Sequence, residues 1–291
     1  MRVPAVVVVV SALLAVPAAA DIAPDVFHGG SGIEVDDPDV AAGIEMKKEH
    51  VVITLHNSQE GAFAVVDATF SMSAAGLAPA QLKVLFPGGG VRVGGAVHPK
   101  LSAFHAFVDG KPVAIRADDK THTSKSGPPG REYTKSRTET WHEFPAVVDD
   151  DTTIRVRYAV AASSVRDAEG YEDRTRASVS YILHTGALWA KAIGAATIEI
   201  RAGDNVDLKG ASLRTLSMPA VIGAPPVLPA GAVRSADAIT WTQTQLEPSE
   251  DDDVEVVFAS AGPTFRADPS EELAKAMAAA ATATRAAPTK R

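Results

Sequence analysis

The residues of this chain that could carry acid–base or metal chemistry are its histidines and carboxylates. The sequence has eight His and 36 Asp+Glu but no Cys, which excludes disulfides, thiolate metal sites and a cysteine nucleophile. No two histidines have the H-x-H or H-x-x-x-H spacing that places two metal ligands on one element. The eight are His28, His50, His56, His98, His105, His122, His142 and His184. A histidine site assembled across different strands remains an alternative. It would bring together two or more of His56, His98, His105, His142 and His184.

Acidic residues gather in predicted turns, where carboxylate and carbonyl oxygens suit a hard cation such as Ca²⁺. The clusters are Asp36-Asp37-Pro38-Asp39, Asp149-Asp150-Asp151, Asp204-Asn205 with Asp207, and Asp251-Asp252-Asp253. No EF-hand spacing fits, because Ala42 stands where a loop beginning at Asp37 needs Gly. Glu132, Glu139 and Glu143 offer carboxylate pairs of the kind used in glycoside hydrolysis, but 36 acids make such pairs unspecific. We expect solvated turns at most of these positions.

Two glycine-rich segments resemble functional loops only superficially. Gly30-Ser31-Gly32 lacks the second Gly of a G-x-S-x-G elbow, because Ile33 occupies that position. The glycines at 88–90 and 94–95 lack the Gly-Lys-Ser/Thr ending of a phosphate loop. The tryptophans could stack on sugars if exposed, but we expect them to anchor the core: Trp141, Trp189 and Trp241. The sequence thus predicts no cofactor and assigns no catalytic residue or metal ligand.

The elements that must position any site are predicted to be short strands. Period-2 alternation of apolar residues is typical of half-buried strands. In the longest run, Ala62 to Met72, the even-numbered residues form one apolar face, while Phe63 and Val65 lie on the other. Further strands are predicted at 51–55, 82–86, 104–108, 112–115, 141–144, 153–160, 178–183, 197–201, 239–244 and 254–259. Asp109-Gly110 predicts a tight hairpin turn. The fold class is all-β, with one or two β-sandwich (immunoglobulin-like) units.

The chain divides by composition into six segments. We expect a signal peptide (1–20), an extended lead-in (21–43), a first sandwich unit (44–117), a polar loop or junction (118–140), a second unit (141–262), and a C-terminal helix and tail (263–291). The Pro-rich stretch 218–233 is expected to cover a sheet edge. In the Ala-rich helix, Asp268 is the expected N-cap, Pro269 the first helical residue and Glu271 the capping-box acid. With little to bury, this helix is expected to be loosely attached.

The first twenty residues predict export. Arg2 precedes an apolar run from Ala5 to Val16, and Ala18-Ala19-Ala20 offers small residues before a cleavage site at Asp21. The run is shorter than the ~20 residues that a membrane span needs, so no membrane segment is expected after cleavage. The expected location is extracytoplasmic, periplasmic or secreted. A net charge of −8 argues against nucleic acid as a partner.

Several segments resemble a family of secreted bacterial β-rich proteins known only as a domain of unknown function. They are Ile44 to Glu49, Phe86-Pro87, Trp141 with Phe144-Pro145, and Tyr181 to Trp189 ahead of Ile193-Gly194. The resemblance spans roughly residues 44–201 and implies export, β-rich folding and an unknown role. It transfers no site residue.

The leading hypothesis is therefore an exported, non-catalytic β-sandwich protein that acts as a binding or envelope-associated module. The alternative is a secreted hydrolase whose site is assembled from distant loops, with a divalent cation as one option. A protein or a glycan is left open as partner, and the sequence does not decide the oligomeric state.

Overall fold

The computed structural model describes residues 34–35, 40, 42–88, 92–93, 96–97, 101–126, 133–166, 172–184, 189–215, 226–261 and 270–283. The expected signal peptide, most of the lead-in and the last residues of the tail lie outside them. Within the described residues, no helix has the length and apolar character that a bilayer crossing requires.

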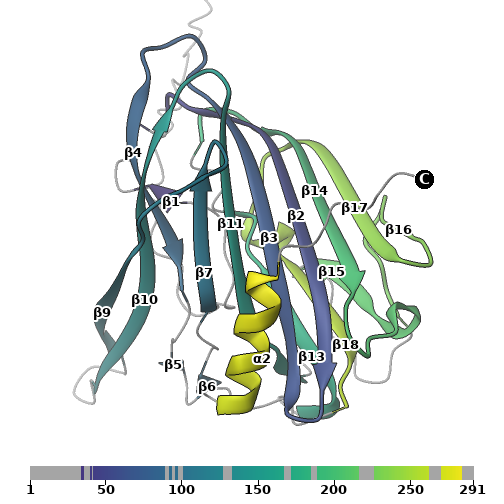
Figure 1. The fold of residues 1–291 in the computed structure, drawn as a ribbon. Coiled ribbons are helices and arrows are strands. Elements are labelled where there is room, and N and C mark those ends of the chain that lie inside the picture. Colours follow the sequence, from purple (N-terminus) through teal and green to yellow (C-terminus); the bar gives the residue numbers. More distant parts are fainter. Residues whose placement is uncertain are drawn as a thin grey trace, which may run out of the picture.

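The fold is all-β with one C-terminal helix, as the alternation of apolar residues predicts (Figure 1). An eight-stranded sheet forms one layer, with strand order β16-β17-β14-β2-β3-β11-β7-β8. Its strands are β16 (Val233–Arg234), β17 (Ala238–Leu246), β14 (Ile193–Ala202), β2 (Glu45–Ser58), β3 (Gly61–Ser73), β11 (Thr152–Ala161), β7 (Leu101–Val108) and β8 (Lys111–Pro112). β14 and β2 are parallel, whereas the other pairs of this sheet are antiparallel.

Two four-stranded sheets contribute the opposing side of the core. The first has the order β1-β4-β10-β9, from β1 (Glu34–Val35), β4 (Ala80–Pro87), β10 (Tyr133–Val148) and β9 (Arg116–Ser126). The second has the order β12-β13-β18-β15, from β12 (Ser163–Arg166), β13 (Glu172–Tyr181), β18 (Val254–Ala259) and β15 (Ser212–Thr215). Short elements complete the chain: β5 (Arg92–Val93) with β6 (Ala96–Val97), and 3-10 turns η2 (Leu208–Gly210) and η3 (Glu250–Asp252).

One hydrophobic core joins the three larger sheets. It contains Phe70 of β3, Phe144 of β10, Ile198 of β14 and Phe258 of β18, all at most 1% exposed. Because strands from both expected sandwich units pair in the eight-stranded sheet, the expected division at 118–140 does not separate two sandwiches. β11 pairs with β3 and β7, and β14 pairs with β2.

The polar tract 118–140, expected to be a loop, mostly forms the paired strands β9 and β10. This expectation is wrong because the pairing depends on the backbone ladder, which runs from Glu143 opposite Arg116 to Tyr133 opposite Ser126. β9 lies at the edge of its sheet, and its hydrogen bonds to β10 use backbone groups that polar residues supply as well as apolar ones. An absent apolar period therefore did not mean an absent strand.

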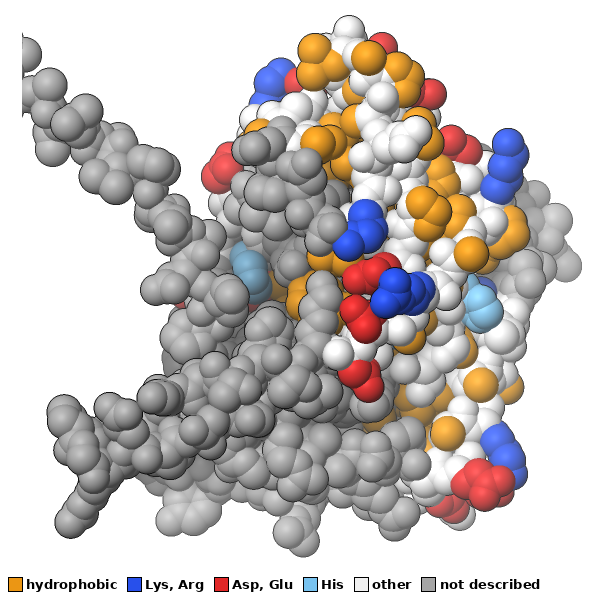
Figure 2. Space-filling view, turned by 90° about the vertical axis from the view of Figure 1, so that its left-hand side faces the viewer, with side chains coloured by type: hydrophobic (Ala, Val, Ile, Leu, Met, Phe, Trp, Pro, Cys, Tyr) orange, Lys and Arg blue, Asp and Glu red, His pale blue; other side chains and the backbone are white. Residues whose placement is uncertain are grey.

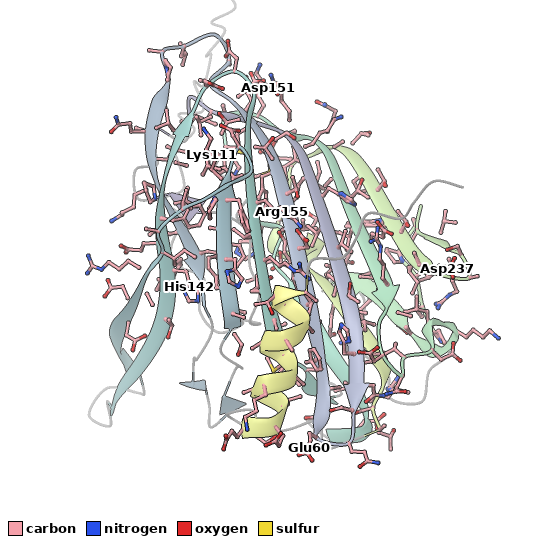
Figure 3. The ribbon with its side chains drawn as sticks, viewed as in Figure 1. Glu60, Lys111, His142, Asp151, Arg155 and Asp237 are labelled. Atoms are coloured by element: carbon pink, nitrogen blue, oxygen red, sulfur yellow. The ribbon has the colours of Figure 1, made fainter. Side chains whose placement is uncertain are left out.

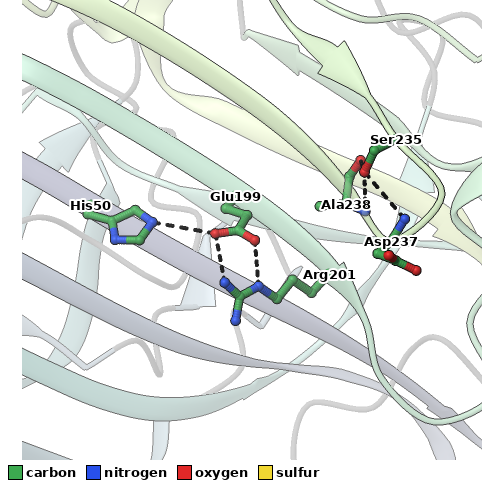
Figure 4. Close-up of polar contacts among 6 residues, drawn as sticks. All are labelled: His50, Glu199, Arg201, Ser235, Asp237 and Ala238. Atoms are coloured by element: carbon green, nitrogen blue, oxygen red, sulfur yellow. Dashed lines mark hydrogen bonds and ion pairs between the residues drawn. The ribbon is translucent and has the colours of Figure 1, made fainter. Parts of the chain in front are cut away.

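Turn geometry follows the sequence closely at two hairpins. Asp109 and Gly110 have φ angles of 50° and 73°, which confirms the tight turn predicted between β7 and β8. Between β16 and β17, the hydroxyl of Ser235 accepts hydrogen bonds from the backbone N–H groups of Asp237 and Ala238 (Figure 4).

The C-terminal helix α2 (Glu271–Thr282) packs firmly, contrary to expectation. Ser270, not Asp268, is its N-cap, since the Ser270 hydroxyl accepts a hydrogen bond from the N–H of Leu273. Met277 is fully buried on the outer face of the eight-stranded sheet, against Phe63 and Val65. The second face of β3 supplies this surface, which is why a helix of mainly Ala has something to bury.

The Pro-rich stretch reaches a sheet edge where it is described. The carbonyl of Val227 accepts a hydrogen bond from the N–H of Leu213 on β15, the last strand of its sheet. Ala230 accepts a hydrogen bond from the indole of Trp241. The edge of β15 is thus covered in part, as expected.

Candidate functional site

The histidines named as candidate ligands lie apart in the described structure. His56 stacks on Phe63 and lies 3.2 Å from the carboxylate of Asp204, at one end of the eight-stranded sheet. His142 stacks on Phe104 between β10 and β7 (Figure 3). Burial there lowers the pKa of His142, so its ring is neutral at pH 7.

The other candidates that the structure describes lie on different elements. His105 lies opposite Arg157 in the β7–β11 ladder. His184 follows β13 by three residues, and His98 lies outside the described residues. No group of three or more His, Asp or Glu residues with metal-binding geometry occurs in the part of the chain that the structure describes.

The predicted acidic turns are used locally to hold backbone N–H groups. Asp149 accepts hydrogen bonds from the N–H of Asp151 and the hydroxyl of Thr152, and these bonds lower its pKa. Asp207 caps η2, and Asp252 accepts a hydrogen bond from the N–H of Ser249. These contacts fit the expectation of ordinary turns.

The three tryptophans are buried, which confirms their expected place in the core. Trp141 is 7% exposed, while Trp189 and Trp241 are each 4% exposed. Of the proposed carboxylate pair residues, Glu143 has a described side chain, whereas those of Glu132 and Glu139 lie outside the described set.

One polar cluster, which sequence reasoning missed, lies between the sheets. The phenol of Tyr181 donates a 2.8 Å hydrogen bond to Glu49 of β2. Beside it, the carboxylate of Asp253 accepts hydrogen bonds from the N–H groups of Leu183 and His184 and contacts the His184 ring at 2.8 Å. Glu49, Tyr181 and Asp253 are at most 5% exposed. A signal was present: Glu49 shares the inward register of Val51 and Ile53.

Burial dominates the electrostatics of this cluster. It raises the pKa of Glu49 from 4.5 to about 7, against the lowering effect of the Tyr181 hydrogen bond and with a smaller raising effect from Asp253. Burial likewise raises the pKa of Tyr181 well above its ordinary value. The Glu49 carboxyl of this cluster can therefore hold a proton near neutral pH. Separately, the contact with Asp253 fixes the orientation of the His184 imidazole.

Asp253 is expected to stabilise the end of β13 through its backbone contacts. Changing Asp253 to Ala should lower the free energy of unfolding by about 2 kcal/mol, because the buried N–H of Leu183 and that of His184 lose their acceptor. Urea unfolding measures this loss. The control His184→Ala keeps both backbone contacts and should lose clearly less; equal losses would mean that the imidazole contact dominates.

The outer face of the eight-stranded sheet carries paired charges. Arg155 makes two hydrogen bonds to Asp67, and Arg201 makes two to Glu199, which also lies 3.5 Å from His50 (Figure 4). These side chains are partly solvated, so each pair contributes modestly to stability. In each pair, the guanidinium group of the arginine donates its hydrogen bonds to the carboxylate of its partner.

A groove lies at the sheet of β4, β10 and β9, with a volume of about 330 Å³. Its apolar lining is formed by Ala114, Ile115 and Pro145, while Phe144 between Glu143 and Pro145 is buried in the main core. Its charged lining is Lys83 of β4, Glu143 of β10 and Arg116 of β9. Figure 2 shows this side of the molecule, where hydrophobic side chains lie beside basic and acidic ones.

Strand pairing places the charged residues of the groove in a row across three strands. Glu143 lies directly opposite Arg116, and Lys83 lies opposite Pro145, two residues along from Glu143. Opposite and diagonal residues of this kind lie on the same face of a sheet. The groove thus presents alternating positive, negative and positive charge next to an apolar wall.

No protein-family model matches this chain, and no curated protein matches it either. Among solved structures it is similar to a candidate nutrient-binding protein from Legionella pneumophila, with 17% identity, a TM-score of 0.49, and coverage of 78% of this chain and 70% of the other. It is also similar to an M1 zinc metallopeptidase from Deinococcus radiodurans, with 14% identity, a TM-score of 0.33, and coverage of 74% of this chain and 42% of the other. Similarity at this level carries no functional argument.

Proposed function

We propose that this chain is an exported, non-catalytic β-sandwich module that binds a small molecule in the groove of β4, β10 and β9. The observation that carries the proposal is the composition of that groove: an apolar wall beside a short row of charges, in a volume of about 330 Å³. Ligand sites combine apolar lining with a few placed polar groups.

The scaffold under the groove supports a preformed site. Phe144 is 1% exposed and belongs to the main core, so β10 is fixed at the point where Glu143 and Pro145 border the groove. β10 is also paired on both sides, with β4 and with β9. A rigid strand positions side chains with little ordering cost when a ligand binds. Export to an extracytoplasmic compartment rests on the N-terminal sequence.

Nuclear magnetic resonance of the Ile115 methyl groups tests the proposal. In a screen against a library of small metabolites, at least one compound should shift the Ile115 signals saturably. Ala114→Trp should abolish the shift, because Ala114 lines the groove and a large side chain would fill it. Ala236→Trp is the control, since Ala236 is also exposed but lies in the β16–β17 turn. A library without any saturable effect on Ile115 would contradict the proposal.

The alternative of a cation-dependent hydrolase is favoured by one observation, the Asp253–His184 contact. A carboxylate that orients an imidazole is the usual support of a general base or a metal ligand. However, the Asp253 carboxylate that contacts the imidazole already accepts hydrogen bonds from the backbone N–H groups of Leu183 and His184.

Calcium is therefore expected to leave the thermal midpoint unchanged. A ligand that binds the folded state alone raises the midpoint with its concentration. Thermal unfolding followed by circular dichroism, with and without millimolar Ca²⁺, measures this. A calcium-dependent rise in the midpoint would favour the alternative over the non-catalytic module.

A further inference from the structure

We propose that the outer edge of strand β9 pairs antiparallel with the same strand of a second copy, which makes the protein a two-fold symmetric dimer. In the part of the chain that the structure describes, β9 pairs with β10 alone and is the last strand of its sheet. The exposed backbone groups of an edge strand are a template on which another extended chain can add a strand. This inference concerns an interaction surface and does not depend on the ligand of the groove.

The outer half of the β9–β10 ladder stands without a third strand. The ladder of β4 with β10 ends at Pro87 opposite Trp141, and one further backbone bond runs from the N–H of Gly88 to the carbonyl of Thr140. Beyond this point, among the described residues, β10 continues with β9 as a two-stranded ribbon (Figure 1). A two-stranded ribbon is marginally stable in water, and further strands stabilise it. Pairing of two copies would turn the two ribbons into one four-stranded sheet.

Apolar burial can contribute little to this ribbon. From Asp119 to Ser126, the sequence of β9 has no apolar residue, and the opposing segment 133–140 of β10 has one, Tyr133. The ribbon is therefore stabilised mainly by backbone hydrogen bonds, and a second copy would add a ladder of the same kind. The edge of β9 thus fits a polar extended strand.

The charge sequence of β9 is complementary to itself in the antiparallel direction. Asp119 lies near the start of the strand and Lys125 near its end. In its own hairpin, Asp119 is opposite Thr140, whose hydroxyl donates a hydrogen bond to it without neutralising its charge, and Lys125 is opposite Thr134. A two-fold axis through His122 would place Asp119 of each copy opposite Lys125 of the other. Opposite charges at directly opposed positions stabilise a strand pair.

Symmetry restricts the register of such a pair. A two-fold axis perpendicular to the sheet keeps each face of the strand on its own side, so opposed positions must lie an even number of residues apart. Asp119 and Lys125 meet this condition. The adjacent allowed registers place Asp119 opposite Thr123, or Lys125 opposite Thr121, and lose the charge pair. The charges therefore favour the register centred on His122.

Analytical ultracentrifugation of the chain without its expected signal peptide, over a range of concentrations, tests the proposal. The wild-type protein should be dimeric in concentrated solution and dissociate on dilution. Asp119→Lys and Lys125→Asp should each weaken the dimer at least about tenfold, because symmetry makes each substitution place like charges opposite one another twice.

Charge exchange identifies the interface. The double variant Asp119→Lys/Lys125→Asp should dimerise as the wild type does, and an equimolar mixture of the two single variants should form a heterodimer, since both restore the opposite charges. Asp237→Lys is the control, because Asp237 is exposed in the β16–β17 turn, and it should leave self-association unchanged. Circular dichroism checks that each variant is folded.

Three results would overturn the proposal. The first is a wild-type protein that stays monomeric at every concentration. The second is a dimer that both single variants leave intact, which would place the contact on another surface. The third is a dimer that the single variants weaken but the double variant does not restore, which would exclude the register that pairs Asp119 with Lys125.

Discussion

The effect of Glu49→Gln on the free energy of unfolding is expected to depend on pH. Relative to its effect at pH 4, the substitution should be about 3 kcal/mol more stabilising at pH 8. Burial raises the pKa of Glu49 from 4.5 to about 7, so the folded state holds a proton that the unfolded chain releases between these values. Since one pKa unit corresponds to about 1.4 kcal/mol, ionising Glu49 in the core costs roughly 3 kcal/mol above pH 7.

The sign of this effect sets the pH window. Below pH 4.5 Glu49 is neutral in both states and makes no pH-dependent contribution. From pH 4.5 to about 7 the wild-type protein loses stability, and above pH 7 the loss is complete. Gln cannot ionise, so the variant should lack this slope. Urea unfolding at several pH values between 4 and 8 measures both proteins.

Glu199→Gln is the matched control, since Glu199 lies in the same sheet but in a different environment. Its hydrogen bonds to Arg201 lower its pKa, so its charge stabilises the folded state above pH 4.5. The same chemical change should therefore be destabilising at pH 8, the opposite sign to Glu49→Gln. If both variants respond to pH alike, the Glu49 carboxyl is not held as a neutral acid in the core.

Met277→Ala is expected to weaken the docking of helix α2 by about 3 kcal/mol. Met277 is fully buried against Phe63 and Val65, and truncating a buried Met to Ala typically costs 2–5 kcal/mol. Hydrogen exchange of the helix amides measures the free energy of local opening, and urea unfolding measures the effect on the whole domain.

Lys275→Ala is the control for the helix, because Lys275 is exposed and forms ion pairs with Glu271 and Glu272 of its own helix. It should leave the exchange of the helix amides nearly unchanged. Equal exchange in wild type and Met277→Ala would mean that the apolar face does not hold the helix. The helix would then be loosely attached, as expected from the sequence alone.

The sequence by itself determined the positions of the strands in which apolar and polar side chains alternate. The register of β3 is the clearest case: its even-numbered residues face the main core, while Phe63 and Val65 face α2. The Asp109-Gly110 turn and the burial of the three tryptophans were also predictable, because turn geometry and apolar burial depend on residue type.

Only the tertiary structure decided which strands pair and what they bring together. The ladder of β9 and β10 is formed by backbone groups, which every residue type supplies, so the polar tract gave no local sign of it. Glu49, Tyr181 and Asp253 meet from positions far apart in the chain, as do Lys83, Arg116 and Glu143. Such convergence is set by the register between strands, and local residue patterns do not encode it.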